Sequence, residues 1–445
     1  MKYVLISFFL FGLGFVQAQN IIADIDAYAN TYLSTGDFSG CIRISKQDSI
    51  LYKNCFGYAN HSFKIPNDKN TKFKIGSVSK QFTAAAILLL EQQNQLKTTD
   101  ALSEYFPTIA NAAKISIEQL LTHTSGLPDI FNIQDFNIFS CQDLEISTLA
   151  TIVLESDLQF EPGAQYQYSN GGYAVLAAII EKISGKTYGA YLKEHIFDPL
   201  KMMDSGHGDT NQVITKLAEG YDPKGYDSLK LTEFIDPELL KGGGSLYSTL
   251  ADLQSWINSI KNETLLSWAS YKKFLNDYGN GYGYGISIYS SFDKAVFGHD
   301  GRINGYIADY LHYREDDITV LILGNIQTGV ADFFRRDVAA IVFGQDYKSR
   351  AKTERPASNS PTKIQALLGS YSFGPNFKVY VELFDGVVQA RANEGGYSEL
   401  VPLEDGRFFS RMLYSYIDFK ADTNGSISKM LWTNNNGNTF EGLKD

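Results

Sequence analysis

Composition and charge exclude several function classes for this chain. It has 445 residues, of which 44% are hydrophobic and 20% charged, values typical of soluble globular proteins. The formal net charge is −11 at pH 7, and the sequence has no run of lysine and arginine that could neutralise successive phosphates. This argues against nucleic acid or an anionic membrane as a partner and favours a small-molecule or peptide substrate.

The N-terminus has the pattern of a secretory signal peptide over residues 1–18. Lys2 precedes an apolar run over residues 3–16, and small or apolar residues stand at Val16 and Ala18. The alternative is a membrane anchor, but the run is shorter than the roughly 20 residues that span a bilayer. We therefore expect cleavage near Ala18, a periplasmic or secreted protein, and no membrane-spanning segment in the mature chain.

The three cysteines leave at least one thiol unpaired. Cys41 and Cys55 lie seven residues to either side of Asp48 in "CIRISKQDSILYKNC", so a hairpin would place them opposite each other. They either form a cross-strand disulfide or are two small residues on one buried face, and we favour the second interpretation because free cysteine behaves as a core residue. Cys141 is expected to be a free, buried thiol.

The predicted elements change in type along the chain. Two alternating strands cover residues 38–58, and residues 77–95 form a helix that is apolar around most of its circumference and therefore buried. A mainly helical region follows over 98–217. Strand-like runs with short turns then occupy 242–325, interrupted by a helix near 251–260 and followed by a helix near 330–343. Short turns favour antiparallel pairing. The fold class is therefore α/β (α+β), with a central antiparallel sheet flanked by helices and a mainly helical lobe.

A composition break at residues 348–362, "KSRAKTERPASNSPT", indicates a linker between two domains. It separates a large domain over 19–347 from a tail over 363–445. Short alternating strands in the tail are separated by Asp-Gly and Asn-Gly dipeptides, which favour tight hairpins. We expect the tail to be a small all-β, barrel-like domain of the lipocalin type.

A serine and a lysine three residues apart occur where this buried helix begins. Ser-x-x-Lys is a weak signal, since it occurs at six serines: Ser77, Ser270, Ser291, Ser349, Ser360 and Ser426. Only Ser77 opens a strongly apolar helix after a glycine-containing turn, where Lys80 can reach its hydroxyl. The helix N-terminus favours negative charge there, and a buried lysine becomes a base. The alternative is an ordinary polar helix start.

A proton relay to the leaving atom requires a further polar group, and Tyr-x-Asn triplets supply candidates. Of three such triplets, Tyr168-Ser169-Asn170 lies in the glycine-rich turn "YQYSNGGY" directly before an apolar helix. A side chain on such an anchored loop is held in a fixed position. The alternative is a structural turn tyrosine.

A strand edge that offers a backbone N–H to a developing oxyanion is the third requirement. Lys or His followed by x-Gly occurs at Lys74, Lys241 and His299, and only His299 ends a strand-like segment. The alternative is a structural histidine. The sequence has no His-Glu-x-x-His and no zinc-type cysteine spacing, so we expect neither a metal nor a cofactor.

These three signals in this order carry a resemblance to a known family. With "FKIGSVSKQFTA", "ISIEQLLTHTSGLPD", "YSNGGYAVLAAIIEKISG", "GGGSLYSTLADLQSW" and "GHDGRINGY", residues 24–343 resemble the serine β-lactamase and penicillin-binding-protein superfamily. The resemblance is to the branch of class C β-lactamases, D-Ala-D-Ala carboxypeptidases and family VIII esterases. The tail is similar, more weakly, to the small β-barrel appended to such exported hydrolases.

The resemblance implies a role for each motif residue. Ser77 would be the acylated nucleophile, Lys80 its base or proton relay, and Tyr168 the group that protonates the leaving atom and later activates water. Asn170 would bind a substrate amide, and the backbone N–H groups of Ser77 and Arg302 would form the oxyanion hole. The resemblance makes no catalytic use of the histidine in "LLTHTSGLP", His123, which we expect to be structural.

The substrate-binding strand, His299, Asp300, Gly301 and Arg302, departs from the resemblance at two positions. His299 replaces the usual lysine, and Asp300 replaces the usual hydroxyl residue that faces a substrate carboxylate. Because like charges repel, we expect inefficient β-lactam hydrolysis and substrates that lack a carboxylate there, unless Arg302 compensates.

The implied function is an exported serine hydrolase that acts through a Ser77 acyl-enzyme on D-amino-acid peptides of the cell-wall type, amides or esters. This is the activity of D-Ala-D-Ala carboxypeptidases, aminopeptidases and esterases. The alternatives are a weak β-lactamase, a non-catalytic penicillin-binding or sensor-like member, or a carrier that acts through the tail.

Overall fold

The computed structural model describes residues 21–445 apart from residues 48, 134–143, 209–210, 358–360 and 394. The expected signal peptide with its cleavage site at Ala18, and the thiol of Cys141, lie outside the described residues. Contacts divide the chain into two compact units. One unit comprises Gly40–Gly220 and Thr232–Asn325; the other comprises Met1–Ser39, Tyr221–Leu231 and Ile326–Asp445. These units alternate along the chain, so the linker at 348–362 stays a prediction.

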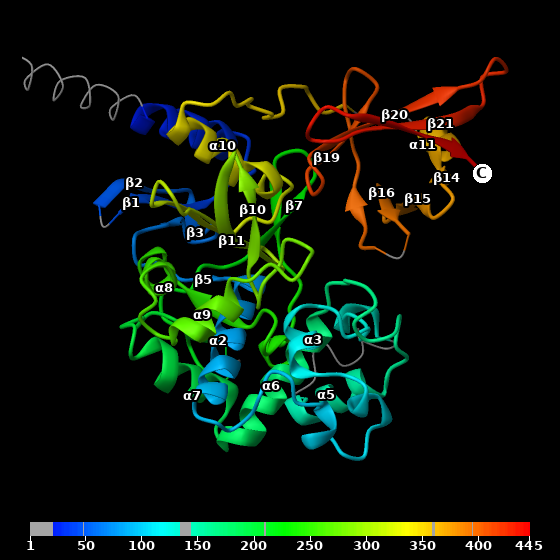
Figure 1. Ribbon diagram of the computed structural model, residues 1–445. Helices are drawn as coiled ribbons and strands as arrows, with labels where there is room; N and C mark the ends of the chain where they lie inside the picture. The colour runs from blue at the N-terminus through cyan, green and yellow to red at the C-terminus, as the bar shows by residue number, and fades with distance from the viewer. Residues whose placement is uncertain (1–20, 48, 134–143, 209–210, 358–360, 394) are drawn as a thin grey trace, which may run out of the picture. The chain divides into compact units, whose positions relative to one another are not determined.

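A six-stranded antiparallel sheet is the centre of the first unit (Figure 1). Its order is β10-β11-β12-β13-β1-β2, so the first two strands of the unit close one edge of a meander formed much later in the chain. The prediction of a central antiparallel sheet is confirmed. The strands are β1 (Gly40–Lys46), β2 (Ser49–Phe56), β10 (Ser287–Ser291), β11 (Lys294–Ile303), β12 (Tyr306–Tyr313) and β13 (Ile318–Gly324).

The first unit also contains smaller sheets. The three-stranded sheet β5-β9-β6 joins β5 (Phe73–Lys74), just before Ser77, to β9 (Leu246–Ser248) and β6 (Gly206–His207). β3 (Tyr58–Asn60) pairs with β4 (Ile65–Pro66).

Cys41 and Cys55 stand directly opposite each other in the β1–β2 ladder and form a disulfide. Their Cα atoms are 4.0 Å apart, because the hairpin register pairs the two positions. Symmetry about the turn therefore predicted the pairing correctly, but the favoured interpretation, two free buried thiols, was wrong.

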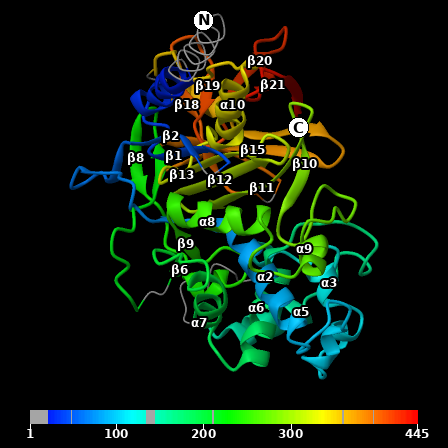
Figure 2. The ribbon, with the colours of Figure 1, turned by 60° about the vertical axis from the view of Figure 1, so that its left-hand side comes forward.

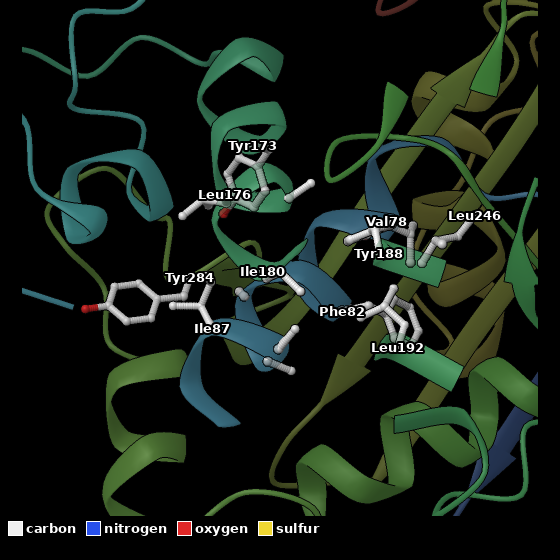
Figure 3. Close-up of a cluster of buried hydrophobic side chains, with 14 of the residues drawn as sticks. Val78, Phe82, Ile87, Tyr173, Leu176, Ile180, Tyr188, Leu192, Leu246 and Tyr284 are labelled. Carbon is white, nitrogen blue, oxygen red and sulfur yellow. The ribbon is translucent and has the colours of Figure 1, made fainter. Parts of the chain in front are cut away.

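The helix α2 (Ser79–Gln92) lies in the core of the first unit and directly follows the 3-10 turn η1 (Gly76–Val78). Figure 3 shows Val78, Phe82 and Ile87 facing side chains of α6 (Asn170–Ser184) and α7 (Tyr188–Leu192). Eleven of the fourteen residues of α2 are buried, as the apolar circumference predicted. The expected helix over 77–95 is thus a 3-10 turn continued by an α-helix.

The remaining helices of this unit form the expected helical lobe and the cover of the sheet. α8 (Leu250–Lys261) packs on β1 and β13, and Figure 2 shows it lying across the sheet. The others are α3 (Ile117–Leu121), α5 (Ile146–Glu155), α9 (Trp268–Phe274), the π-helix η5 (Lys193–Phe197), and the 3-10 turns η2 (Leu102–Glu104), η3 (Ala110–Ala113), η4 (Ile130–Asn132) and η6 (Pro237–Leu240).

The second unit contains the barrel-like domain predicted for the tail. Nine antiparallel strands follow the order β17-β16-β15-β14-β22-β21-β20-β19-β18 around a separate core. They are β14 (Gly369–Gly374), β15 (Phe377–Phe384), β16 (Val387–Ala392), β17 (Ser398–Glu399), β18 (Val401–Pro402), β19 (Phe408–Ser410), β20 (Ser415–Ala421), β21 (Ile427–Thr433) and β22 (Thr439–Lys444).

This unit also contains a helix over residues 21–34 and four further elements. They are β7 (Tyr221–Lys224), β8 (Ser228–Leu231), α10 (Ala331–Phe343) and α11 (Pro361–Leu367). The carboxylate of Asp37 forms ion pairs with Lys352 and Arg411, and all three side chains are almost fully buried. In the described part of the chain, no helix is long and apolar enough to cross a membrane.

Phe82 provides a test of the α2 core. Its ring is fully buried, 4.4 Å from the ring of Trp256 and 5.5 Å from that of Phe197. Phe82→Ala leaves a cavity and should destabilise the protein by about 3–5 kcal/mol, measured as a lower urea midpoint. The control Phe63→Ala removes a ring that is 80% exposed and should change stability by about 0.5 kcal/mol or less.

Candidate active site

Two glycines let the turn that carries Ser77 approach the edge of β11. Gly76 has φ +48°, and a Cβ atom there would lie 2.9 Å from the backbone N of Arg302. A Cβ atom at Gly301 would lie 2.0 Å from the backbone O of Ile75. β10 pairs with β11 only as far as Gly298. Beyond Gly298, the edge of β11 contacts the turn that carries Ser77. The local geometry thus places the backbones of Ser77 and Arg302 side by side.

The amine of Lys80 contacts the hydroxyl of Ser77 and two other oxygen atoms. Its Nζ lies 3.2 Å from Ser77 Oγ, 2.6 Å from Asn170 Oδ1 and 2.8 Å from the carbonyl O of Gly243. The amide and carbonyl oxygens can only accept hydrogen bonds. A neutral amine that donates to both therefore keeps its lone pair for the proton of Ser77.

Burial makes Lys80 a base at physiological pH. The side chain is fully buried, and desolvation lowers its pKa from 10.5 to about 7, against the smaller opposing effects of Asp129 and Asp300. Nearby carboxylates favour the charged form of an amine, whereas removal from water disfavours it. Desolvation has the larger effect, so the neutral amine is accessible near neutral pH.

Tyr168 comes from a different loop and lines the same cavity as Ser77. The Lys80 amine lies 4.7 Å from the centre of the Tyr168 ring. Burial raises the pKa of Tyr168 above its usual 10, and the nearby Ser77 hydroxyl opposes this only in part. At neutral pH the phenol therefore holds its proton and can act as an acid.

Asn170 follows Tyr168 and is fixed at both ends of its side-chain amide. Oδ1 accepts from Lys80, while Nδ2 and the backbone N–H donate to Asp129 Oδ2 at 2.8 and 2.9 Å. Ser169 caps α6 by accepting from the N–H of Gly172. The predicted role of Asn170 in binding a substrate amide stays a prediction, and in the structure it orients Lys80.

The imidazole of His299 is buried and has a partner on each nitrogen. Nδ1 donates to the carbonyl O of Asp300 at 2.6 Å, and Nε2 lies 2.9 Å from the Tyr282 hydroxyl. His123 accepts a hydrogen bond from the N–H of Ser169 at 3.1 Å, and its ring lies tilted against that of Tyr168 with 4.2 Å between ring centres. The contacts of His123 therefore help to hold the Tyr168 loop in place.

Two cavities adjoin Ser77 and Arg302. The smaller, of about 40 Å³, is lined by Asn170 and mainly by apolar side chains: Ile130, Phe131, Leu239, Leu240 and Ile303. The larger, of about 320 Å³, is lined by aromatic and polar side chains: Tyr166, Tyr168, Tyr282, Ser287, His299 and Asp300. The hydroxyl of Ser77 is therefore accessible from two chemically different sides.

The structure thus brings together all the residues that the sequence motifs singled out, from Ser77 to Arg302. Their catalytic and binding roles stay predictions. Sequence reasoning missed Asp129, Tyr282 and the carbonyl of Gly243, which contact Asn170, His299 and Lys80 respectively. The motif "TSGLPD" ends at Asp129 and was the available signal for it. Within the described residues, no cluster of three or more histidine, cysteine, aspartate or glutamate side chains could hold a metal ion.

Comparison with known proteins places this geometry in a family. Residues 26–344 match the Beta-lactamase family. A protein of Bacillus subtilis (strain 168) named penicillin-binding protein PbpX is 31% identical over 312 residues, covering 70% of this chain and 76% of its own. Another penicillin-binding protein of that strain is 29% identical over 430 residues, 89% of this chain and 93% of its own. The teichoic acid D-alanine hydrolase of Staphylococcus aureus is 26% identical over 304 residues, which cover 66% of this chain and 72% of its own.

Solved structures have the same fold. The octameric penicillin-binding protein homologue from Pyrococcus abyssi matches with a TM-score of 0.65 at 24% identity, covering 95% of this chain and 99% of its own. The D-amino acid amidase from Ochrobactrum anthropi SV3 matches with a TM-score of 0.63 at 23% identity, covering 73% and 96%. The family match over most of the chain confirms the resemblance: this chain belongs to the Beta-lactamase family and is a serine hydrolase.

Proposed function

We propose that the protein is an exported serine hydrolase that acts through a Ser77 acyl-enzyme on D-amino-acid peptides, amides or esters. The observation that carries this proposal is the contact of the Ser77 hydroxyl with a fully buried Lys80 amine whose pKa is about 7. A serine hydroxyl becomes a potent nucleophile when an adjacent base can take its proton. The teichoic acid D-alanine hydrolase among the relatives supports the D-amino-acid class of substrate.

Acylation follows from the contacts of Ser77. Its oxygen attacks the substrate carbonyl carbon while its proton passes to the lone pair of Lys80. The oxyanion that forms accepts hydrogen bonds from the backbone N–H groups of Ser77 and Arg302, which the close packing at Gly76 and Gly301 supports. Collapse of this intermediate breaks the bond to the leaving atom.

Tyr168 supplies the proton for the leaving atom. Its raised pKa keeps the phenol protonated, and it lines the same cavity as Ser77, on the side of the reacting carbon. The proton taken up by Lys80 then restores the phenol. In deacylation a water molecule attacks the ester carbon and passes its proton along the same groups to neutral Lys80. The bond between the acyl carbon and Ser77 Oγ then breaks as this proton moves from Lys80 to Ser77 Oγ, which restores the serine hydroxyl and the neutral amine.

Labelling tests the identity of the nucleophile. The wild-type protein should react with a fluorophosphonate probe and turn over p-nitrophenyl esters, whereas Ser77→Ala should lose both because the attacking oxygen is gone. Ser426→Ala removes another serine of a Ser-x-x-Lys pattern, exposed on the other unit, and should label normally. A folded wild type that reacts with no acylating probe and turns over no ester would refute the proposal.

The pH dependence of labelling tests the base. Only neutral Lys80 accepts the serine proton, so the second-order labelling rate should rise with pH, with a midpoint near 7, and level off at higher pH. Lys80→Met should abolish this titration along with most of the rate. Lys97→Met, at an exposed lysine, should leave the profile unchanged. A rate that is constant between about pH 5 and pH 9 would argue against Lys80 as the base.

Asp129 is a positioning residue, and its charge should be visible in the same profile. Because the carboxylate raises the pKa of Lys80, Asp129→Asn should shift the midpoint to lower pH. The altered hydrogen bonds to Asn170 should also reduce the plateau rate. Glu104→Gln, at an exposed acid, is the control. A lower plateau with an unmoved midpoint would limit Asp129 to a structural role.

A further inference from the structure

We propose that the larger cavity beside Ser77 is a leaving-group subsite that selects an ammonium ion carried by the departing alcohol or amine. Asp300 and the rings of Tyr166, Tyr168 and Tyr282 line this cavity and would hold the cation. The inference rests on the proposed function, since it names the substrate class of the same site.

The reaction geometry assigns one side of the substrate to each cavity. Tyr168, which gives its proton to the leaving atom, lines only the larger cavity, whereas Asn170 lines only the smaller one. The departing group therefore enters the larger cavity, and the acyl group faces the smaller one. With about 40 Å³ and mainly apolar walls, the smaller cavity suits a small apolar substituent such as a methyl group.

Asp300 brings a carboxylate to the larger cavity, which Arg302 also lines. Asp300 lines the cavity, and its charge reaches both Lys80 and Tyr168. The Arg302 guanidinium is paired with Asp309, Nη1 to Oδ1 at 2.8 Å, and also donates to the carbonyl O of Gly301. The guanidinium thus has the Asp309 carboxylate as a partner, and Asp300 is the carboxylate that lines the cavity.

Aromatic rings complete the subsite. The ring of Tyr282 lies 6.2 Å from that of Tyr166 and 6.3 Å from that of Tyr168, centre to centre, so three rings border one space. Aromatic faces attract cations, and walls of this kind recognise quaternary ammonium groups. A carboxylate on the leaving group would meet Asp300 instead and be repelled. The polarity at this point is thus the reverse of a carboxylate-binding site.

Three acetyl esters with departing alcohols of similar size test the proposal. They are acetylcholine, its neutral isostere 3,3-dimethylbutyl acetate, and an ester whose alcohol ends in a carboxylate, 4-acetoxybutanoate. At pH 8.5, where Lys80 is largely neutral, kcat/KM for the choline ester should exceed that for the neutral isostere by about tenfold or more. The carboxylate ester should be the slowest of the three.

Variants at Asp300 identify the source of the selectivity. In Asp300→Asn the preference for the choline ester should fall to about threefold or less, and in Asp300→Ser the carboxylate ester should gain relative to the other two. Ratios between substrates cancel the effect of Asp300 on the pKa of Lys80. Asp293→Asn, at an exposed aspartate of the turn between β10 and β11, should keep the wild-type ratio.

The outcomes separate this inference from the proposed function. If wild type turns over the neutral isostere as fast as the choline ester, the cation subsite is refuted and the serine hydrolase stands. The subsite is also refuted if Asp300→Asn keeps the full preference for choline. If neither the esters nor a fluorophosphonate acylates Ser77, the proposed function fails and the inference fails with it.

Discussion

The removal of one amine from water is the constraint on which the site depends. Lys80 lies in the first turn of a helix whose other buried residues are mostly apolar, and burial of a charged ammonium is strongly unfavourable unless it is paired. Within the described part of the chain, Lys80 has no direct ion pair with a carboxylate. The protein surrounds the amine with neutral acceptors, Asn170 and Gly243. The neutral form of the amine, which a base requires, is therefore accessible near pH 7.

The acceptors of Lys80 come from separate parts of the chain, so the base is formed only by the tertiary fold. Lys80 belongs to α2, Asn170 begins α6, and Gly243 lies in the glycine run that leads to β9. Packing of α2 against α6 (Figure 3) brings these groups together and also excludes water from the amine. The same contacts thus stabilise the unit and lower the pKa of Lys80. A change that loosens this core would return the lysine to its charged, unreactive form.

Local sequence patterns predicted the parts of the site that depend on short distances along the chain. A serine and a lysine three residues apart on a buried helix must be neighbours, and alternating strands with short turns must pair antiparallel. Asp129 and Tyr282 escaped prediction because their partners, Asn170 and His299, are fixed only when distant loops fold against each other. The disulfide was predicted in part. The sequence predicted that the hairpin places Cys41 opposite Cys55, but it did not decide between two free thiols and a disulfide bond. The position of the barrel-like domain along the chain was also predicted, whereas the interleaving of the two compact units was not.

Reactivity and selectivity are carried by different elements of this site. Ser77 and Lys80 belong to one continuous turn and helix, whereas Asp300 belongs to β11, beside the cavity that receives the departing group. Even so, the two functions are not independent. Asp300 attracts a cationic leaving group and, through the same field, raises the pKa of Lys80. A bound cation would partly cancel that field and lower the pKa of the amine, so occupation of the cavity would itself favour the basic form that accepts the serine proton.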